Sequence, residues 1–92
     1  MKIAALKFEQ ITESHRRAST VIGEYNIHMT HNLGTVKYSS GGQVYRSPVI
    51  ERRPEESQYE FLRRLESLAY EQHRKRANVI ILSLLGVDED DL

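Results

Sequence analysis

Two tyrosines and two arginines at regular spacing are the side chains best suited to binding another macromolecule. Tyr59 and Arg63 are four residues apart, and Tyr70 and Arg74 repeat the pattern eleven residues later. Because eleven residues make close to three turns of an α-helix, both pairs would project in the same direction. Tyrosine and arginine are enriched at the energetic centres of interfaces, and arginine binds phosphate or carboxylate through two hydrogen bonds. The spacing predicts a contact ridge made of Tyr59, Arg63, Tyr70 and Arg74.

The same segment also fits a solvated helix that neutralises its own charges. Glu60 precedes Arg64 by four residues, and Glu71 precedes Lys75 by four, which is the favourable order for an ion pair on one helix face. Each such pair stabilises an exposed helix by only about 0.2–0.5 kcal/mol. Both interpretations stay open, because the charge pairs and the contact ridge occupy different stripes of the helix.

Further basic clusters occur at Arg16–Arg17, Arg52–Arg53 and Arg74–Lys75–Arg76. A small fold could bring some of them together, in a patch that meets a nucleic-acid backbone or an acidic protein groove. If each cluster points separately into water, they are ordinary surface charge.

Histidines and glycines give little indication of catalytic or metal chemistry. His28 and His31 have a ligand-like spacing, but residues three apart on a strand face opposite sides, and no third ligand is evident nearby. The glycines of "SSGG", residues 39–42, indicate a hairpin turn rather than a phosphate-binding loop. A chain of this size also has little room for a dry catalytic pocket. We expect no enzyme activity, no metal, no cofactor and no small-molecule substrate.

The composition indicates one small globular domain with an acidic tail. The chain has 92 residues, of which 39% are apolar and 28% charged. Two cores would not fit in it, so we assign residues 1–87 to a single domain and residues 88–92 to the tail. Four of the thirteen acidic residues lie in the tail, which leaves nine against thirteen basic residues, or +4, for the domain. That domain is only mildly basic, and such tails are usually solvated.

Nothing in the sequence indicates a secretory or membrane segment. The apolar run in "MKIAALKFEQITE" is too short and too soon charged for a signal peptide, and no stretch approaches the ~18 apolar residues of a membrane span. The chain contains no cysteine, which is compatible with a reducing compartment. We expect a soluble cytoplasmic protein without a membrane partner.

The N-terminal segment, residues 3–18, fits two kinds of element. Residues that recur at spacings of four and three, as on the face of a helix, are Ala4, Phe8, Ile11, His15 and Ala18. Residues 2–10 also alternate as a strand would. Because its length favours a helix over the whole segment, we predict a helix there, with a strand as the alternative.

The middle of the chain alternates with the period of two that is typical of strands. Tyr25, Ile27 and Met29 are apolar positions of a first strand, and residues 35–39 and 43–50 form two more between turns at 31–34 and 39–42. Pro48 cannot donate a ladder hydrogen bond, which places the last strand at an edge or at a bulge. We predict an antiparallel sheet of about three strands.

A long C-terminal helix is predicted to begin near Pro54 and to run at least to Arg76. Its apolar arc, which should cover the sheet, consists of Phe61, Leu62, Leu65, Leu68 and Ala69. Residues 79–85, "VIILSLL", either continue this helix or form a buried strand, and Gly86 ends the element. The predicted fold class is therefore α+β, with the helix packed on the small sheet.

Two long stretches carry a resemblance beyond these patterns: "MKIAALKFEQITESHRRAST", residues 1–20, and "RRPEESQYEFLRRLESLAYEQHRKR", residues 52–76. With its length and its lack of a catalytic motif, the chain resembles the small phage-encoded anti-CRISPR proteins that act on type I-F systems. The resemblance implies a phage inhibitor that works in the host cytoplasm, by stoichiometric binding rather than by catalysis.

The partner that this resemblance implies is the crRNA-guided surveillance complex, through its backbone and large subunits and through the guide RNA. Binding would block hybridisation of target DNA with the guide, which such complexes hold in a positively charged channel. The partner-binding residues would be those of the contact ridge together with Arg52 and Arg53, and the acidic tail could mimic phosphate.

Two other functions are compatible with the sequence. The basic clusters fit a small regulatory phage protein that binds free nucleic acid, with an affinity that falls steeply with salt. Residues 79–85 could instead form the self-complementary interface of a structural dimer.

Overall fold

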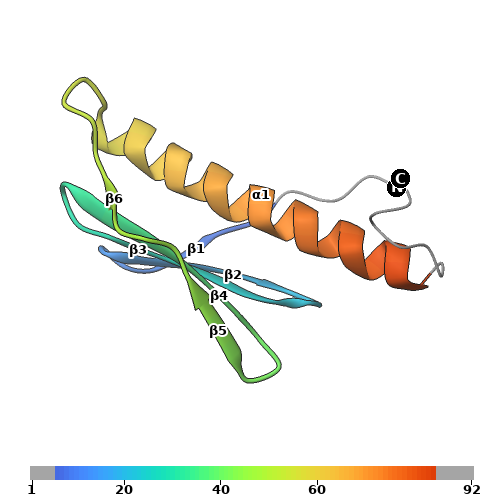
Figure 1. Cartoon of the computed structure of the whole chain (residues 1–92). Helices are drawn as coiled ribbons and strands as arrows, with labels where there is room; N and C mark the ends of the chain where they lie inside the picture. Colours follow the sequence, from blue (N-terminus) through green and yellow to red (C-terminus); the bar gives the residue numbers. More distant parts are fainter. Residues whose placement is uncertain (1–5, 85–92) are drawn as a thin grey trace.

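The computed structural model describes residues 6–84 and shows one antiparallel sheet with a single long helix across one of its faces (Figure 1). The elements, in chain order, are β1 (Glu9–Thr12), β2 (His15–Thr20), β3 (Gly23–Met29), β4 (Leu33–Ser40), β5 (Gln43–Arg46), β6 (Ile50–Glu51) and α1 (Gln58–Leu84). The predicted α+β class is confirmed. The residues of the acidic tail lie outside the described range.

The sheet is larger than the predicted three strands. Its order is β1-β2-β3-β4-β5, so that consecutive strands are neighbours, and β6 also pairs with β4. β5 and β6 lie one after the other along the same edge of β4, separated by a segment that contains Pro48. Since proline has no N–H for the ladder, the edge strand that the sequence predicted is divided into two short pieces.

The helix predicted over residues 3–18 is wrong for the described part of that segment, residues 6–18. β1 and β2 form a hairpin there, and β2 continues the ladder onto β3 from His15↔His28 to Thr20↔Gly23. The spacing of Phe8, Ile11, His15 and Ala18 imitates a helical face. Among these four residues, however, Ile11 is exposed and only Ala18 is fully buried. Pairing of β2 with its neighbour β3 outweighs the local pattern. The alternative strand over residues 2–10 overlaps only the first part of β1.

Glycines shape β4 at both of its ends. Gly41 and Gly42 have φ of 55° and 82°, and they form the two-residue turn into β5 that the "SSGG" segment predicted. Gly34 was predicted to lie in a turn over residues 31–34, but it lies within β4. A Cβ on Gly34 would lie 2.6 Å from Leu65 Cδ1, so the glycine allows the helix to approach the sheet closely.

α1 begins at Gln58, later than predicted, because Ser57 caps it. The Glu60 N–H donates to Ser57 Oγ (3.1 Å), and the Ser57 N–H donates to Glu60 Oε1 (3.2 Å), which is a capping box. Pro54 lies in the turn before the helix. Of the two alternatives for residues 79–85, the helix is correct as far as Leu84. Gly86 lies outside the described residues.

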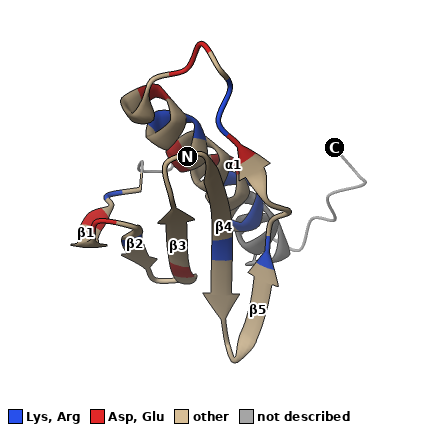
Figure 2. Ribbon diagram, turned by 90° about the vertical axis from the view of Figure 1, so that its left-hand side faces the viewer, with Lys and Arg blue, Asp and Glu red and all other residues tan. Residues whose placement is uncertain are grey.

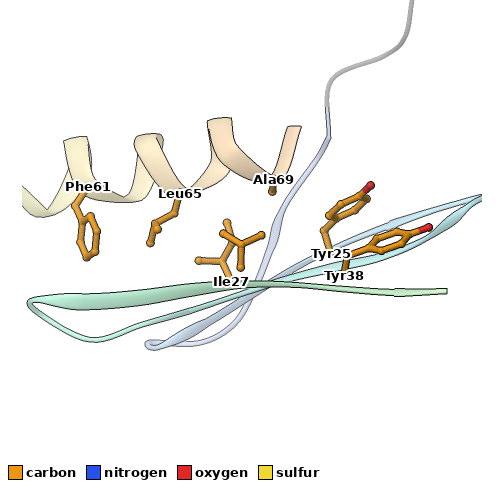
Figure 3. Close-up of a cluster of buried hydrophobic side chains, with 7 residues drawn as sticks. Tyr25, Ile27, Tyr38, Phe61, Leu65 and Ala69 are labelled. Atoms are coloured by element: carbon orange, nitrogen blue, oxygen red, sulfur yellow. The ribbon is translucent and has the colours of Figure 1, made fainter. Parts of the chain in front are cut away.

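The core lies between α1 and the covered face of the sheet (Figure 3). Phe61, Leu65 and Ala69, at successive helical turns, are fully buried against side chains of β3 and β4. Leu62 and Leu68 of the predicted apolar arc lie at its margins, and Leu68 is 36% exposed. The core side chains contributed by the sheet are Tyr25, Ile27, Val36 and Tyr38.

Candidate functional site

The contact ridge lies on the side of α1 turned away from the core. At 100° per residue its four positions lie about 120–180° around the helix from Leu65, the middle residue of the buried stripe. Tyr59 is 66% exposed, and the Arg63 guanidinium donates to Tyr59 Oη (3.1 Å) with its carbon 5.8 Å from the ring centre. The first tyrosine–arginine pair is therefore preorganised on the surface. Arg74 is exposed and Tyr70 half-buried.

Three of the four ridge residues line one groove. Arg63, Tyr70 and Arg74 face it from α1, and Leu6 and Phe8, from the segment that leads into β1, close its other side. The groove has a volume of about 400 Å³ and a lining of mixed charge, since two glutamates of α1 also contribute to it. Such a surface suits a protein partner, with aromatic, cationic and apolar contacts together.

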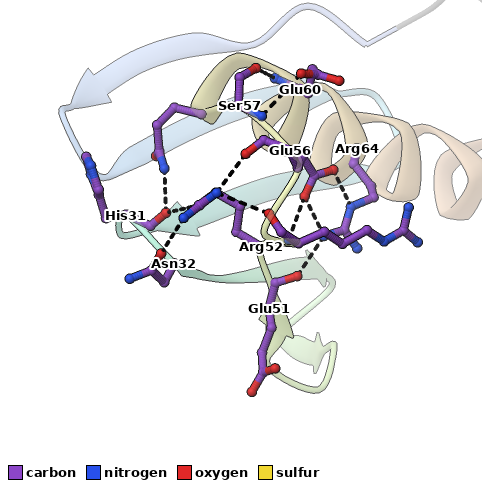
Figure 4. Close-up of polar contacts among 10 residues, drawn as sticks. His31, Asn32, Glu51, Arg52, Glu56, Ser57, Glu60 and Arg64 are labelled. Carbon is purple, nitrogen blue, oxygen red and sulfur yellow. Dashed lines mark hydrogen bonds and ion pairs between the residues drawn. The ribbon is translucent and has the colours of Figure 1, made fainter.

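Arg52 and Arg53 are not part of this groove, and Arg52 has a structural role. Its guanidinium donates to His31 O (3.1 Å), Asn32 Oδ1 (3.0 Å), Arg53 O (3.1 Å) and Glu56 O (2.7 Å), as Figure 4 shows. These bonds attach the segment before α1 to the turn between β3 and β4. Because its donors are used internally, Arg52 is poorly suited to gripping a partner. Arg53 is exposed beside it.

Arg64 forms an ion pair with Glu56 rather than with Glu60. Arg64 Nη2 lies 2.8 Å from Glu56 Oε1, and it also donates to Glu51 O (2.7 Å) (Figure 4). This is the one ion pair among the described residues, so the intrahelical pairs predicted for Glu60–Arg64 and Glu71–Lys75 are wrong. The hydrogen bond from Arg64 holds the pKa of Glu56 below its ordinary value. Glu60 is instead committed to the capping box.

A second candidate surface lies on the face of the sheet that α1 leaves uncovered. The register places Arg17 opposite Asn26, Asn26 opposite Lys37, and Lys37 opposite Arg46, on four adjacent strands. Their sequence neighbours Tyr25 and Tyr38 point to the helix, and side chains alternate along a strand, so these four point away from it. We name Arg17, Lys37 and Arg46 the basic row. Figure 2 shows basic residues on the adjacent strands β4 and β5.

Two histidines extend the basic row along the same face. His15 and His28 are paired between β2 and β3, with stacked rings 4.4 Å apart, and His15 Nε2 lies 2.6 Å from Asn26 Oδ1. Burial lowers the pKa of His28, and so do the neighbouring positive charges of His15, Lys37 and Arg46. A partner that brings negative charge to this face would therefore relieve repulsion between its cations.

The acidic residues of this face are distributed over β1, β3 and β6, where Glu51 is paired with Leu33 of β4. Glu9 on β1 is paired with Arg17, and Glu24 accepts a hydrogen bond from Asn26 Nδ2 (3.1 Å). Lys37 and Arg46 have no carboxylate opposite them in the register. The end of the row on β4 and β5 is therefore the part of it with no carboxylate directly opposite.

The sequence contains a signal for this surface that the helix-centred interpretation missed. Lys37 lies between Val36 and Tyr38, and Arg46 follows Tyr45, so both are out of phase with residues that face the helix. Alternation alone places them on the uncovered face. Their alignment in one row, however, depends on the strand register, which the two-residue turn at Gly41–Gly42 sets.

Metal binding by His28 and His31 receives no support from their placement. His28 stacks on His15, and the His31 carbonyl accepts hydrogen bonds from Arg52 and Gln58. Within the described part of the chain, no three histidine, aspartate or glutamate residues lie close enough together to hold a metal ion.

Comparison with protein-family models, with curated proteins and with solved structures finds no match to this chain. α1 is 27 residues long, but no helix in residues 6–84 is apolar enough over a sufficient length to cross a membrane. The contact ridge and the basic row, together with the sequence resemblance, are therefore the features that indicate a function.

Proposed function

We propose that the protein is a phage inhibitor of CRISPR–Cas immunity that binds the type I-F crRNA-guided surveillance complex and blocks hybridisation of target DNA. The observation that carries this proposal is the basic row on the uncovered sheet face. A preorganised tyrosine–arginine pair on α1 offers a second contact on another side of the fold. The resemblance of residues 1–20 and 52–76 to small anti-CRISPR proteins supports the choice of partner. The site of action would be the host cytoplasm.

The basic row is suited to the guide RNA. Lys37 and Arg46 lie directly opposite each other on neighbouring strands, so their charges can meet consecutive phosphates of one nucleic-acid strand. Phosphate contacts of this kind position a protein without reading bases. A protein seated on the guide would exclude target DNA by occupying the strand with which it must pair.

The contact ridge is suited to the protein subunits of the complex. Its groove combines Tyr70 with Arg63, Arg74 and the apolar residues Leu6 and Phe8. Interface cores are enriched in aromatic residues and arginine. The backbone and large subunits, which hold the RNA in a basic channel, are the partners proposed for this face.

Reversal of two charges on the ridge tests this part of the proposal. The Arg63→Glu/Arg74→Glu variant should bind a purified type I-F surveillance complex at least about tenfold more weakly than the unchanged protein, measured by biolayer interferometry. The matched control is Lys7→Glu/Lys75→Glu, which makes the same change of charge at exposed positions outside the groove lining.

The control variant should bind as the unchanged protein does and should still prevent a labelled target DNA from hybridising. Equal affinity of the ridge variant and the control would remove the contact ridge from the interface. Absence of binding by the unchanged protein would contradict the proposed function itself.

The same basic row also favours a second function, that of a small regulatory protein that binds free nucleic acid. This alternative predicts that single-stranded RNA binds without the complex, and that the affinity falls with salt with a log–log slope of about −0.7 per neutralised phosphate. The proposed inhibitor should instead bind free RNA weakly and the assembled complex tightly. Electrophoretic mobility shifts at low salt distinguish the two.

A further inference from the structure

A second groove, distinct from the contact ridge, lies between α1 and the edge of the sheet formed by β5 and β6. It has a volume of about 490 Å³, within the range of small-molecule sites. Three tyrosines, of which Tyr45 is partly exposed, contribute to its wall. We name it the tyrosine groove. Its lining includes Tyr25, Tyr38, Tyr45, Pro48, Leu68 and Arg76.

Two buried hydrogen-bond donors of this groove have no partner within the described part of the chain: Tyr25 Oη and Arg76 Nε. Tyr25 is 0% exposed, whereas its neighbour Tyr38 donates to Ile22 O (2.9 Å). Buried polar groups are nearly always paired in native proteins, because leaving them unpaired is costly. Two unpaired donors in the wall of one groove therefore point to a ligand that accepts hydrogen bonds.

The positive charge of the tyrosine groove indicates that the ligand carries a negative charge. The Arg76 guanidinium lies over the rings of Tyr38 and Tyr45, 4.1 Å and 4.7 Å from their centres. Arg46 is the other charged residue among the described lining residues, and no carboxylate is present among them. Arg76 forms no ion pair with another described residue. The groove thus contains a positive charge that nothing in the described chain compensates.

The Tyr25 hydroxyl keeps its proton at neutral pH and can therefore donate a hydrogen bond to such a ligand. Its burial and the neighbouring Tyr38 raise the pKa of Tyr25 to about 12, while Arg76 acts in the opposite direction. Both residues lie against Tyr38, whose ring centre is 4.8 Å from that of Tyr25 and 4.1 Å from the guanidinium carbon of Arg76. A group with two oxygen acceptors could therefore be reached by both donors at once.

We propose that the tyrosine groove binds a small carboxylate carried on an apolar stem, such as an arylalkanoate. Its carboxylate accepts hydrogen bonds from Arg76 Nε and Tyr25 Oη, and its stem packs against Tyr45, Pro48 and Leu68. A carboxylate fits better than a phosphate dianion, because one guanidinium and one hydroxyl face an otherwise apolar wall. A free small molecule fits better than a protein segment, because both donors are buried in the wall of the groove and the charged end must enter first.

Titration with a matched pair of probes tests this proposal in the isolated protein. 4-Phenylbutanoate and its neutral amide, 4-phenylbutanamide, are each added up to about 10 mM to ¹⁵N-labelled protein and followed by NMR. The carboxylate should cause saturable shifts of the Arg76 Nε–H and of the Tyr45 amide, with an affinity at least about tenfold higher than that of the amide. Equal affinity for the two probes, or no saturable shift, would overturn the proposal.

Two variants locate the binding. Tyr25→Phe removes an unpaired hydroxyl, so the fold should be retained. Arg76→Gln removes the positive charge. Each variant should weaken carboxylate binding about tenfold or more. Arg53→Gln, which changes a residue outside the groove, should leave the affinity for the carboxylate unchanged. Binding of the peptide acetyl-Leu-Glu-Phe-amide without binding of the free carboxylate would assign the groove to a protein partner, and so would also overturn the proposal. Because the surveillance complex is absent from this experiment, its result is independent of the proposed function.

Discussion

The Lys37→Glu/Arg46→Glu variant is expected to bind the type I-F surveillance complex at least about a hundredfold more weakly than the unchanged protein. The two side chains are opposite each other on β4 and β5, and no carboxylate of a neighbouring strand is paired with either. Reversal of both charges replaces two phosphate contacts by two repulsions. Biolayer interferometry with immobilised complex measures the change.

The salt dependence of binding provides a second test of the basic row. If the basic row contacts RNA phosphates, neutralising one of its residues should reduce the slope of log affinity against log salt by about 1. Lys37→Gln tests this at a position where the side chain is half-buried and points away from the core. The Lys7→Glu/Lys75→Glu control, with the same change of charge as the double reversal, should retain both affinity and slope. A hundredfold loss in this control as well would mean that net charge, rather than the basic row, governs binding.

The Leu65→Ala variant is expected to lose about 2–5 kcal/mol of the free energy of unfolding. Leu65 is fully buried between α1 and the sheet, where its methyl groups lie over Gly34. The cavity left by the truncation cannot be filled without moving the helix. For a domain whose total stability is about 5–15 kcal/mol, this loss is large.

Urea denaturation followed by circular dichroism measures this loss, and Leu68→Ala is the matched control. Leu68 lies on the same helix, but it is 36% exposed, so the same truncation there should cost about 1 kcal/mol or less. Equal losses at the two positions would contradict the packing of α1 described here.

Helical periodicity made the central part of the fold predictable from the sequence. Phe61, Leu65 and Ala69 recur every four residues, and all three are buried as that spacing predicts. Alternation likewise identified Tyr25 and Ile27 as the inward positions of a strand. In both segments the local pattern and the tertiary packing agree, so the sequence alone was sufficient.

The N-terminal hairpin could not be predicted in the same way. Every residue of β1 is exposed, so no inward stripe marks it as a strand. Its structure depends on pairing with β2, and β2 in turn on β3, through registers that no local period reveals.

The candidate sites were predictable to different degrees. The spacing of Tyr59 and Arg63 correctly placed them beside each other on α1. The internal role of Arg52 depends on carbonyl groups of His31 and Glu56, which the sequence does not place near it. The basic row depends on the registers of four strands, and became visible only with the sheet.

The most direct test is to photo-crosslink the uncovered sheet face to the guide. Val44 lies on β5 and is 55% exposed, paired with Ser39 on the face that carries Lys37 and Arg46. A benzophenone amino acid in place of Val44, irradiated in the assembled complex, should join the protein to labelled crRNA. The same amino acid in place of Glu55, in the exposed turn before α1, should not. Capture of the complex without any RNA adduct from position 44, or equal adducts from both positions, would contradict the placement of this face on the guide.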